Sequence, residues 1–402
     1  MPREVEYEPM SVKELLAEMK NTAELLIDLS YSAVLLRSNA VAEEVLELES
    51  RMDVLQLRAR MSLLMAARNT DDAEALAPVL GIVGAAEKIS DAAGDIAKII
   101  LEDVGLPEAM RAALPESVET LVRVEISSDS PLVGQSLGAS NLETETGVRV
   151  IAVRRTGDWL TEPNADTVLW GDDVALLRGP ELGVTSVYEK LSGEQYEPPE
   201  PPTESSADLE RAMDSVVLMK DVSELAVDLA YGAVLFDDDA LAEEVLDLEA
   251  EVDALQSRFE AWTLQAATEV DDPVSLRGLV HLAAATEVIS DAALEISEGV
   301  LRGLDSHPVI REAVLESDEI IARYEVSEGS RLAGRTLGDV AVKTETGMRV
   351  IAVRRSDESR SPTGKQTGWV VSPGPETKLD VGDVLIAKGT RTGAERMVEL
   401  TE

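Results

Sequence analysis

Residues 143–155 read ETETGVRVIAVRR, and residues 343–355 read KTETGMRVIAVRR, at an offset of 200 residues. The same offset relates residues 28–35 (DLSYSAVL) to residues 228–235 (DLAYGAVL). Late in the second copy, an insertion near SRSPTGKQTG increases the offset to about 210. Similarity at a fixed offset over such a length indicates an internal duplication. The sequence therefore predicts two copies of one architecture.

Within each copy, the pattern changes from helical to strand-like, near residue 115 and again near residue 317. Before the first change, apolar residues recur at three- and four-residue steps over 11–36, 41–67 and 73–102, which predicts three long amphipathic helices. The short polar breaks between them favour an antiparallel arrangement. After the change, runs such as GVRVIAVRR and VALLRG alternate with turn signals, which predicts a small domain of strands with a short helix.

The boundary between the copies is predicted at residues 192–208, SGEQYEPPEPPTESSAD, because clustered prolines favour an extended, semi-rigid spacer. The predicted fold class is α+β, a helical unit followed by a small mixed domain, duplicated in one chain. The predicted domains are helical unit 1 at 1–115, small domain 1 at 116–191, the linker at 192–208, helical unit 2 at 209–316 and small domain 2 at 317–402.

The chain is strongly acidic, with 78 acidic and 36 basic residues and a net charge of −42. Such a surface repels phosphate backbones, so we expect no direct binding to nucleic acid. The acids are interleaved with regular apolar positions, which favours a folded chain over a disordered one. An acidic excess of this kind is typical of adaptation to high salt, where screening weakens self-repulsion, so the sequence predicts a halophilic source.

Several chemistries are excluded or disfavoured by what the sequence lacks. There is no cysteine, which excludes disulfides, thiol nucleophiles and cysteine-based metal sites. There is no nucleophile elbow, no phosphate-binding loop and no zinc-binding HExxH helix, so we expect no enzyme activity. The sequence has no apolar run of about 18 residues and no signal-peptide pattern. We expect a cytoplasmic protein that does not itself span a membrane.

The strand-rich halves share a long motif of glycines, a Thr-Gly pair, an apolar strand ending in two arginines, and a Gly-Asp turn. The first copy carries it at Ser130, Pro131, Gly134, Leu137, Gly138, Thr146, Gly147, Val150, Arg154, Arg155, Gly171 and Asp172. The second copy carries it at Ser330, Gly334, Leu337, Gly338, Thr346, Gly347, Val350, Arg354, Arg355, Gly382 and Asp383. The motif resembles the TrkA-C domain, or RCK C-terminal domain, a regulatory module of potassium channels and transporters. The Rossmann half that usually precedes it is missing, so this route to nucleotide binding is unsupported.

The helical halves carry short Glu-x-x-x-Asp motifs in both copies. They run from Glu24 to Asp28, from Glu87 to Asp91, from Glu224 to Asp228 and from Glu287 to Asp291. These motifs resemble those of PhoU, the phosphate-transport accessory protein, whose units are three-helix bundles. The resemblance implies that the carboxylates hold a divalent metal.

On a helix, residues four apart share a face, so two acidic stripes are predicted on the third helices. Their members are Glu87, Asp91 and Asp95 in copy one, and Glu287, Asp291 and Glu295 in copy two. Together with the first-helix pairs they could form an all-oxygen site for iron, Mn²⁺ or Mg²⁺. The alternative is a solvated acidic face of a halophilic protein, and the residues alone leave both readings open.

Arg154, Arg155, Arg354 and Arg355 stand out in so acidic a chain. Guanidinium groups pair bidentately with phosphate, so these residues are candidates for binding a small anionic ligand. The TrkA-C resemblance implies cyclic di-AMP as that ligand, bound between paired domains. Salt bridges to the abundant acids are the alternative interpretation of the same residues.

The sequence therefore predicts a regulatory protein of potassium transport that senses a small anionic ligand and acts on a membrane cation or phosphate transporter, peripheral to the membrane. The two copies are expected to form an internal pseudo-dimer, and a homo-oligomer is left open. The alternative function is a PhoU-like metal-binding scaffold or adaptor in phosphate-transport signalling.

Overall fold

The computed structural model describes twelve segments of the chain. They are residues 11–67, 69–107, 120–142, 146–156, 158–160, 163–179, 181–196, 207–270, 272–302, 308–316, 320–355 and 369–401. Most of the predicted linker, residues 197–206, lies outside them.

Three long helices form each helical unit, as predicted. They are α1 (Val12–Leu36), α2 (Asn39–Ala66) and α3 (Thr70–Leu101) in copy one, and α7 (Ala207–Phe236), α8 (Asp239–Ala266) and α9 (Arg277–Leu301) in copy two. Helix α2 begins two residues earlier than the apolar periodicity predicts, because the Ser38 side chain accepts a hydrogen bond from the Val41 amide and caps the helix there. Helix α9 is preceded by the 3₁₀ turn η2 (Pro273–Leu276).

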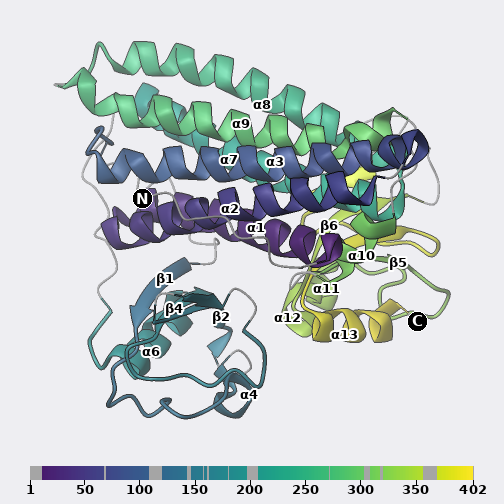
Figure 1. The fold of residues 1–402 in the computed structure, drawn as a ribbon, viewed down its shortest axis with the longest axis horizontal. Helices are drawn as coiled ribbons and strands as arrows, with labels where there is room; N and C mark the ends of the chain where they lie inside the picture. The colour runs from purple at the N-terminus through teal and green to yellow at the C-terminus, as the bar shows by residue number, and fades with distance from the viewer. Residues whose placement is uncertain are drawn as a thin grey trace.

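The two helical units share one hydrophobic core. Helix α3 packs along α9 in an antiparallel sense, because Gly278 at the start of α9 meets Gly105 beyond the end of α3, and Gly299 near the end of α9 meets Pro78 near the start of α3. Helix α10 (Pro308–Glu316) of copy two also packs against α1 of copy one. Figure 1 shows the long helices lying side by side as one body.

Each small domain contains a four-stranded antiparallel sheet. Its strands are β1 (Thr120–Glu125), β2 (Arg149–Arg155), β3 (Asp158–Leu160) and β4 (Val174–Gly179) in copy one, ordered β1-β4-β2-β3, and β5 (Ile320–Glu325), β6 (Met348–Arg354), β7 (Trp369–Val371) and β8 (Val384–Gly389) in copy two, ordered β5-β8-β6-β7. The helices of these domains are α4 (Leu137–Ser140) and α6 (Glu181–Ser192), and α11 (Leu337–Val340), α12 (Val342–Thr346) and α13 (Arg391–Thr401).

Both faces of the sheets are covered, which explains the nearly continuous apolar run in β4 and β8. In copy two, Leu385 and Ala387 belong to the core of the small domain, whereas Ile386 between them belongs to the core of the helical body. The register of β6 against β8 shifts between Val350 and Ala352, at a bulge. Each sheet is thereby fastened to its own helical unit.

Two glycines of the sequence motif have structural roles that recur in both copies. Gly134 and Gly334 adopt positive φ angles, of 80° and 76°, which side chains rarely tolerate. Gly138 and Gly338 lie so close to the carbonyl oxygens of Ala165 and Pro375 that a Cβ would be 2.9 Å away. The motif therefore records backbone requirements of the small domain.

The Gly-Asp turn was aligned one residue out of register between the copies, which the strand pairing corrects. Val174 and Val384 begin equivalent strands, so Asp173 is the counterpart of Asp383, and Asp172 is the counterpart of Gly382. Asp172 and Gly382 both have positive φ angles, of 67° and 85°. Asn and Asp adopt this region more readily than other residues, which explains why Asp can stand where the second copy has Gly.

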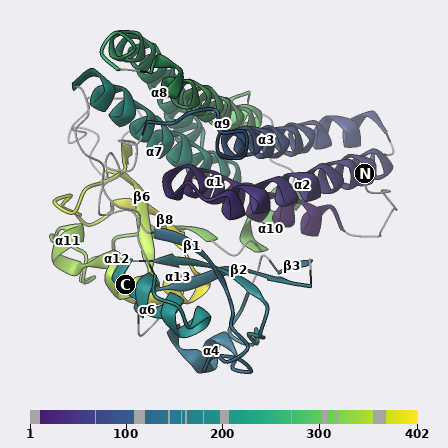
Figure 2. The same ribbon diagram turned by 90° about the vertical axis from the view of Figure 1, so that its left-hand side faces the viewer.

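The two small domains lie on the same side of the helical body but apart from each other (Figures 1 and 2). Among the described residues, no element of one sheet makes extensive contact with the other small domain, and the extensive contacts between the copies are made by helices. The internal pseudo-dimer is therefore formed through the helical units rather than through paired small domains.

Candidate functional site

The first-helix carboxylates that were predicted to bind metal lie where the sheets meet the helical body. Asp28 pairs with Arg178 of β4 at 2.6 Å. In copy two, Asp228 pairs with Lys388 of β8 at 2.5 Å and with Arg349 of β6 at 3.0 Å. The structure thus brings basic side chains of the sheets to these acids.

Glu24 joins this network from the other copy. Its carboxylate accepts hydrogen bonds from Lys388 at 3.1 Å and from Lys20 at 2.8 Å. Lys20 is only 2% exposed, and Asp228 is 4% exposed. Lys388 therefore bridges a carboxylate of copy one and a carboxylate of copy two inside a largely buried cluster.

Lysines and tyrosines cross reciprocally between the copies. Lys20 lies over the ring of Tyr231 at 5.4 Å, and Lys220 lies over the ring of Tyr31 at 5.5 Å. Lys220 also pairs with Glu224 at 2.7 Å. Burial opposes the charged form of Lys220, but Glu224 and other nearby carboxylates outweigh burial and raise its pKa. The interface is thus an approximate two-fold arrangement within one chain.

The third-helix stripes face acids of the second helix that sequence reasoning missed. In copy one, Glu49 and Asp53 of α2 interact with Asp91; burial, followed by like-charge repulsion, raises the pKa of Glu49 and of Asp91. In copy two, Glu249 and Asp253 of α8 play the same part toward Glu287 and Asp291, with raised pKa values for the same causes. Glu49-x-x-x-Asp53 and Glu249-x-x-x-Asp253 repeat the spacing of the other motifs, and that was the signal available in the sequence.

Asp95 and Glu295, the last members of the two stripes, are held by lysines. Asp95 pairs with Lys98 at 2.9 Å, and Glu295 pairs with Lys88 across the α3–α9 interface. Within the described residues, no three acidic or histidine side chains converge in a group that could hold a metal ion. Metal binding by the ten predicted carboxylates therefore stays a prediction, and the arrangement offers no coordination geometry for it.

Removing one charge from each acidic cluster should stabilise the protein. The raised pKa of Asp91 and of Asp291 means that the folded state holds protons more strongly than the unfolded state, so stability is gained as the pH falls through the folded pKa and is lost above it. We expect Asp91→Asn with Asp291→Asn to gain about 0.5 kcal/mol per site at neutral pH, after allowance for solvent screening.

This gain is measured as the shift in urea midpoint at pH 7 and at pH 4.5 in low salt. It should shrink toward the acidic pH and when salt is added, because protonation and screening remove the same repulsion. A variant that is less stable than the wild type at neutral pH would contradict the prediction.

All four predicted anion-binding arginines are engaged by carboxylates. Arg154 of β2 contacts Glu44 of α2 at 2.9 Å and Glu47 of α2 at 3.0 Å. Arg354 of β6 lies 3.5 Å from Asp238, the residue that caps α8, and also lies over the ring of Trp369. These two arginines therefore join the sheets to the helical units.

Arg155 and Arg355 instead stabilise the small domains internally. Arg155 donates two hydrogen bonds to Asp173, at 2.6 and 2.9 Å, and one to the carbonyl of Val168. Arg355 donates to Asp383 at 2.8 Å and to the carbonyl of Lys378 at 2.7 Å. The salt-bridge alternative is thus realised at each site, and ligand binding by these arginines stays a prediction.

Asp173 should be far more important than its neighbour Asp172. Asp173 is 2% exposed, accepts from Arg155 and from the Trp170 amide, and was not singled out from the sequence, whereas Asp172 is exposed. We expect Asp173→Asn to lower the stability of the first small domain by about 2 kcal/mol, because buried hydrogen bonds to a charged group are lost. Asp172→Asn is the matched control, with a change below about 0.5 kcal/mol. Equal shifts in thermal melting of the two variants would refute this role.

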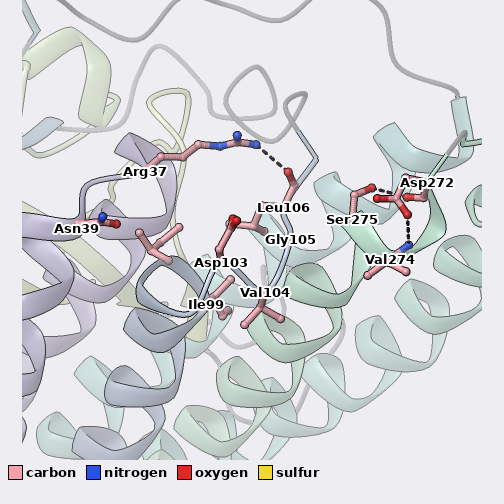
Figure 3. A pocket seen from close by; sticks show the side chains of 11 residues that line it. Arg37, Asn39, Ile99, Asp103, Val104, Gly105, Leu106, Asp272, Val274 and Ser275 are labelled. Atoms are coloured by element: carbon pink, nitrogen blue, oxygen red, sulfur yellow. Dashed lines mark hydrogen bonds between the residues drawn. The ribbon is translucent and has the colours of Figure 1, made fainter.

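A cavity of about 430 Å³ lies at a different junction between the copies. It is bounded by Arg37 and Asn39 from the α1–α2 turn, by residues 103–106 after α3, and by residues 272–275 of copy two (Figure 3). The Arg37 guanidinium donates to the carbonyl of Leu106 at 2.7 Å. None of the predicted site residues lines this cavity.

Family models account for most of the chain. The PhoU domain model matches residues 16–100 and 216–300, and the TrkA-C domain model matches residues 121–192 and 321–401. This chain is a tandem PhoU and TrkA-C protein. Both resemblances drawn from the sequence motifs are confirmed, as are the duplication and the α+β fold class.

Relatives of this PhoU and TrkA-C protein include subunits and channels of potassium transport. It is 25% identical over 119 residues to the K(+)/H(+) antiporter subunit KhtT of Bacillus subtilis, an alignment that covers 28% of this chain and 67% of the relative. It is 28% identical over 87 residues to potassium channel protein 1 of Methanocaldococcus jannaschii, which covers 22% of this chain and 23% of that protein. The chain therefore spans about a quarter of the channel protein.

Solved structures with similarity to the tandem protein include the PhoU protein of Pseudomonas aeruginosa, with 13% identity and a TM-score of 0.40 over 73% of this chain and 96% of that one. Another is the RCK_C domain dimer of BusR from S. agalactiae in complex with c-di-AMP, with 27% identity and a TM-score of 0.17 over 20% of this chain and 88% of that one. Both TM-scores are low, and the family assignment rests on the domain models. Within the described residues, no helix combines the length and the apolar character that a membrane span requires.

Proposed function

We propose that this chain is a non-catalytic regulatory protein of a membrane potassium transport system, and that its TrkA-C domains bind a small anionic ligand such as cyclic di-AMP. The TrkA-C assignment and the potassium-transport names of the relatives support this function. The observation that carries the mechanism is the position of Arg154. This arginine belongs to a TrkA-C strand, yet carboxylates of the PhoU-like helix α2 hold it.

The position of Arg154 makes ligand binding and domain contact competitive. An anionic ligand that pairs with Arg154 takes it from Glu44 and Glu47, and a ligand that pairs with Arg354 takes it from Asp238. A ligand shifts a conformational equilibrium by its differential affinity for the two states. Binding at these arginines would therefore favour a state in which the sheet is released from the helices, and the helical body would present a changed surface to the transporter.

A thermal-shift titration of the full chain with cyclic di-AMP tests the ligand, with ATP and inorganic phosphate as controls. A saturable rise in melting temperature is expected, since ligand at about 100 times its Kd stabilises the folded state by about 2.7 kcal/mol. No shift with any of the three anions would remove the ligand from the proposal.

Two substitutions test the competition itself. Glu47→Gln should tighten cyclic di-AMP binding, because Glu47 is 33% exposed and competes for the same guanidinium. Arg154→Gln should weaken binding. If Glu47→Gln leaves the affinity unchanged while Arg154→Gln abolishes it, the arginine binds ligand without the proposed link to the helices.

The second candidate function is a metal-binding scaffold of PhoU type, favoured by the acidic clusters that recur in both copies. There, Glu49, Asp53 and Asp91 are close enough to repel one another, and a bound cation would relieve that repulsion. Elemental analysis of the purified chain decides: stoichiometric iron, manganese or magnesium that is lost in Asp91→Asn supports the scaffold. Metal-free protein that gains stability in the same variant supports a solvated acidic face.

A further inference from the structure

An apolar surface continues the α2–α3 face beyond the acidic cluster of copy one. Asp53 lies near Asp91 across the two antiparallel helices. Three helical turns further along, the same register places Leu64 of α2 beside Leu80 of α3. Both side chains are well exposed, at 73% and 42%. Together with Leu57, Met61 and Met65 of α2, they are called the α2–α3 tip below.

The second copy serves as an internal comparison for this surface. Leu264 and Val280 repeat the central pair, with 73% and 49% exposure. The surrounding residues differ, because the positions of Leu57, Arg60, Met61 and Met65 are occupied in copy two by Ser257, Glu260, Ala261 and Gln265. Since both copies form the same helices, the fold does not require the additional apolar residues of copy one. Something other than folding accounts for the exposed apolar area.

The charge of the α2–α3 tip is opposite to that of the chain. Residues 54–66 contain Arg58 and Arg60 and no acid, in a chain with a net charge of −42. Its apolar residues Val54, Leu57, Met61 and Leu64 follow the alternating three- and four-residue steps of a seam that receives another helix. Two such faces brought together antiparallel would oppose arginines with arginines, so self-pairing is disfavoured and an acidic occupant is favoured.

We propose that the α2–α3 tip is a docking surface for an amphipathic helix of a partner protein whose apolar stripe is flanked by carboxylates. The proposal assigns an interaction surface that is separate from the arginines of the TrkA-C domains, and it holds whether or not those domains bind a ligand.

The experiment measures binding of a fluorescent amphipathic peptide of about 20 residues, with leucines along one face and glutamates beside them, to the full chain by anisotropy. The control peptide has lysines in place of the glutamates. The control protein carries Leu57→Ser, Arg60→Glu, Met61→Ala and Met65→Gln, which are the residues of copy two at the equivalent positions and are therefore compatible with the helix.

The glutamate peptide should bind the wild type at least about tenfold more tightly than it binds the control protein, and more tightly than the lysine peptide binds the wild type. Circular dichroism should show both proteins equally helical. Equal binding to both proteins, or preference for the lysine peptide, would overturn the proposal. Two other losses specific to the control protein would also overturn it: self-association in the absence of peptide, which assigns the surface to a second copy, or binding to anionic lipid vesicles, which assigns it to a membrane.

Discussion

The Lys388→Met variant should lose about 3 kcal/mol of stability, because removing one partner of a buried ion pair leaves charge without compensation. Lys388 is the common donor to Glu24 and Asp228, and its side chain is only 13% exposed. Methionine preserves the length and apolar character of the stem while removing the charge. We expect the urea midpoint of the helical body, followed by circular dichroism at neutral pH, to fall accordingly.

Arg178→Met is the matched control for this substitution. Arg178 holds the equivalent place on β4 and pairs with Asp28, but that pair is more exposed, at 29% and 24% for the two side chains. Ion pairs open to solvent contribute about 1 kcal/mol or less, so the loss should be clearly smaller. If the two variants lose the same stability, the bridge between the copies made by Lys388 has no special weight.

The two interface tyrosines should respond to phenylalanine substitution in opposite directions. The Tyr31 hydroxyl lies 2.7 Å from the Thr286 hydroxyl in the buried interface. The position equivalent to Thr286 in copy one is Ala86, and among the described residues the buried Tyr231 hydroxyl has no hydrogen-bond partner. Burial raises the pKa of both phenols, so neither ionises near neutral pH. Tyr31→Phe should cost about 1 kcal/mol, and Tyr231→Phe should gain about 1 kcal/mol by removing an unsatisfied buried group.

Thermal melting of the two variants side by side tests this expectation, since each loses one oxygen and little volume. A destabilising Tyr231→Phe would mean that its hydroxyl is satisfied in solution, by water for instance, and would remove the asymmetry between the two sites. Ala86→Thr would then be expected to bring no benefit.

The sequence was sufficient for the architecture because the duplicated motif is tied to the backbone. Residues such as Gly138 occur where nothing larger can stand, so the same letters recur wherever the same turn is built. Helical periodicity likewise predicted three helices per unit, since burial of one face determines where apolar residues fall. Only the ends differed, because caps such as Ser38 are set by local hydrogen bonds rather than by periodicity.

The site was harder to predict because it depends on contacts between distant segments. Glu24 and Glu87 carry motifs that look alike in sequence, but α1 faces a sheet that supplies Lys388, whereas α3 faces α2, which supplies more acids. Helical spacing gives the face of a residue on its own helix and says nothing of the partner opposite. The importance of Asp173 escaped notice for a related reason, since its burial beneath Arg155 depends on how β2 pairs with β4.

The antiparallel packing of α3 on α9 has a consequence for how this molecule can evolve. Two separate identical subunits must place every residue on both sides of their axis, so a change on one side is imposed on the other. Here the partners are joined, and Lys88 can face Glu295 on one side of the axis while Val288, its counterpart, carries no charge. Joining the halves also makes their association independent of protein concentration. One half is thereby free to specialise, and the other can keep the pair intact.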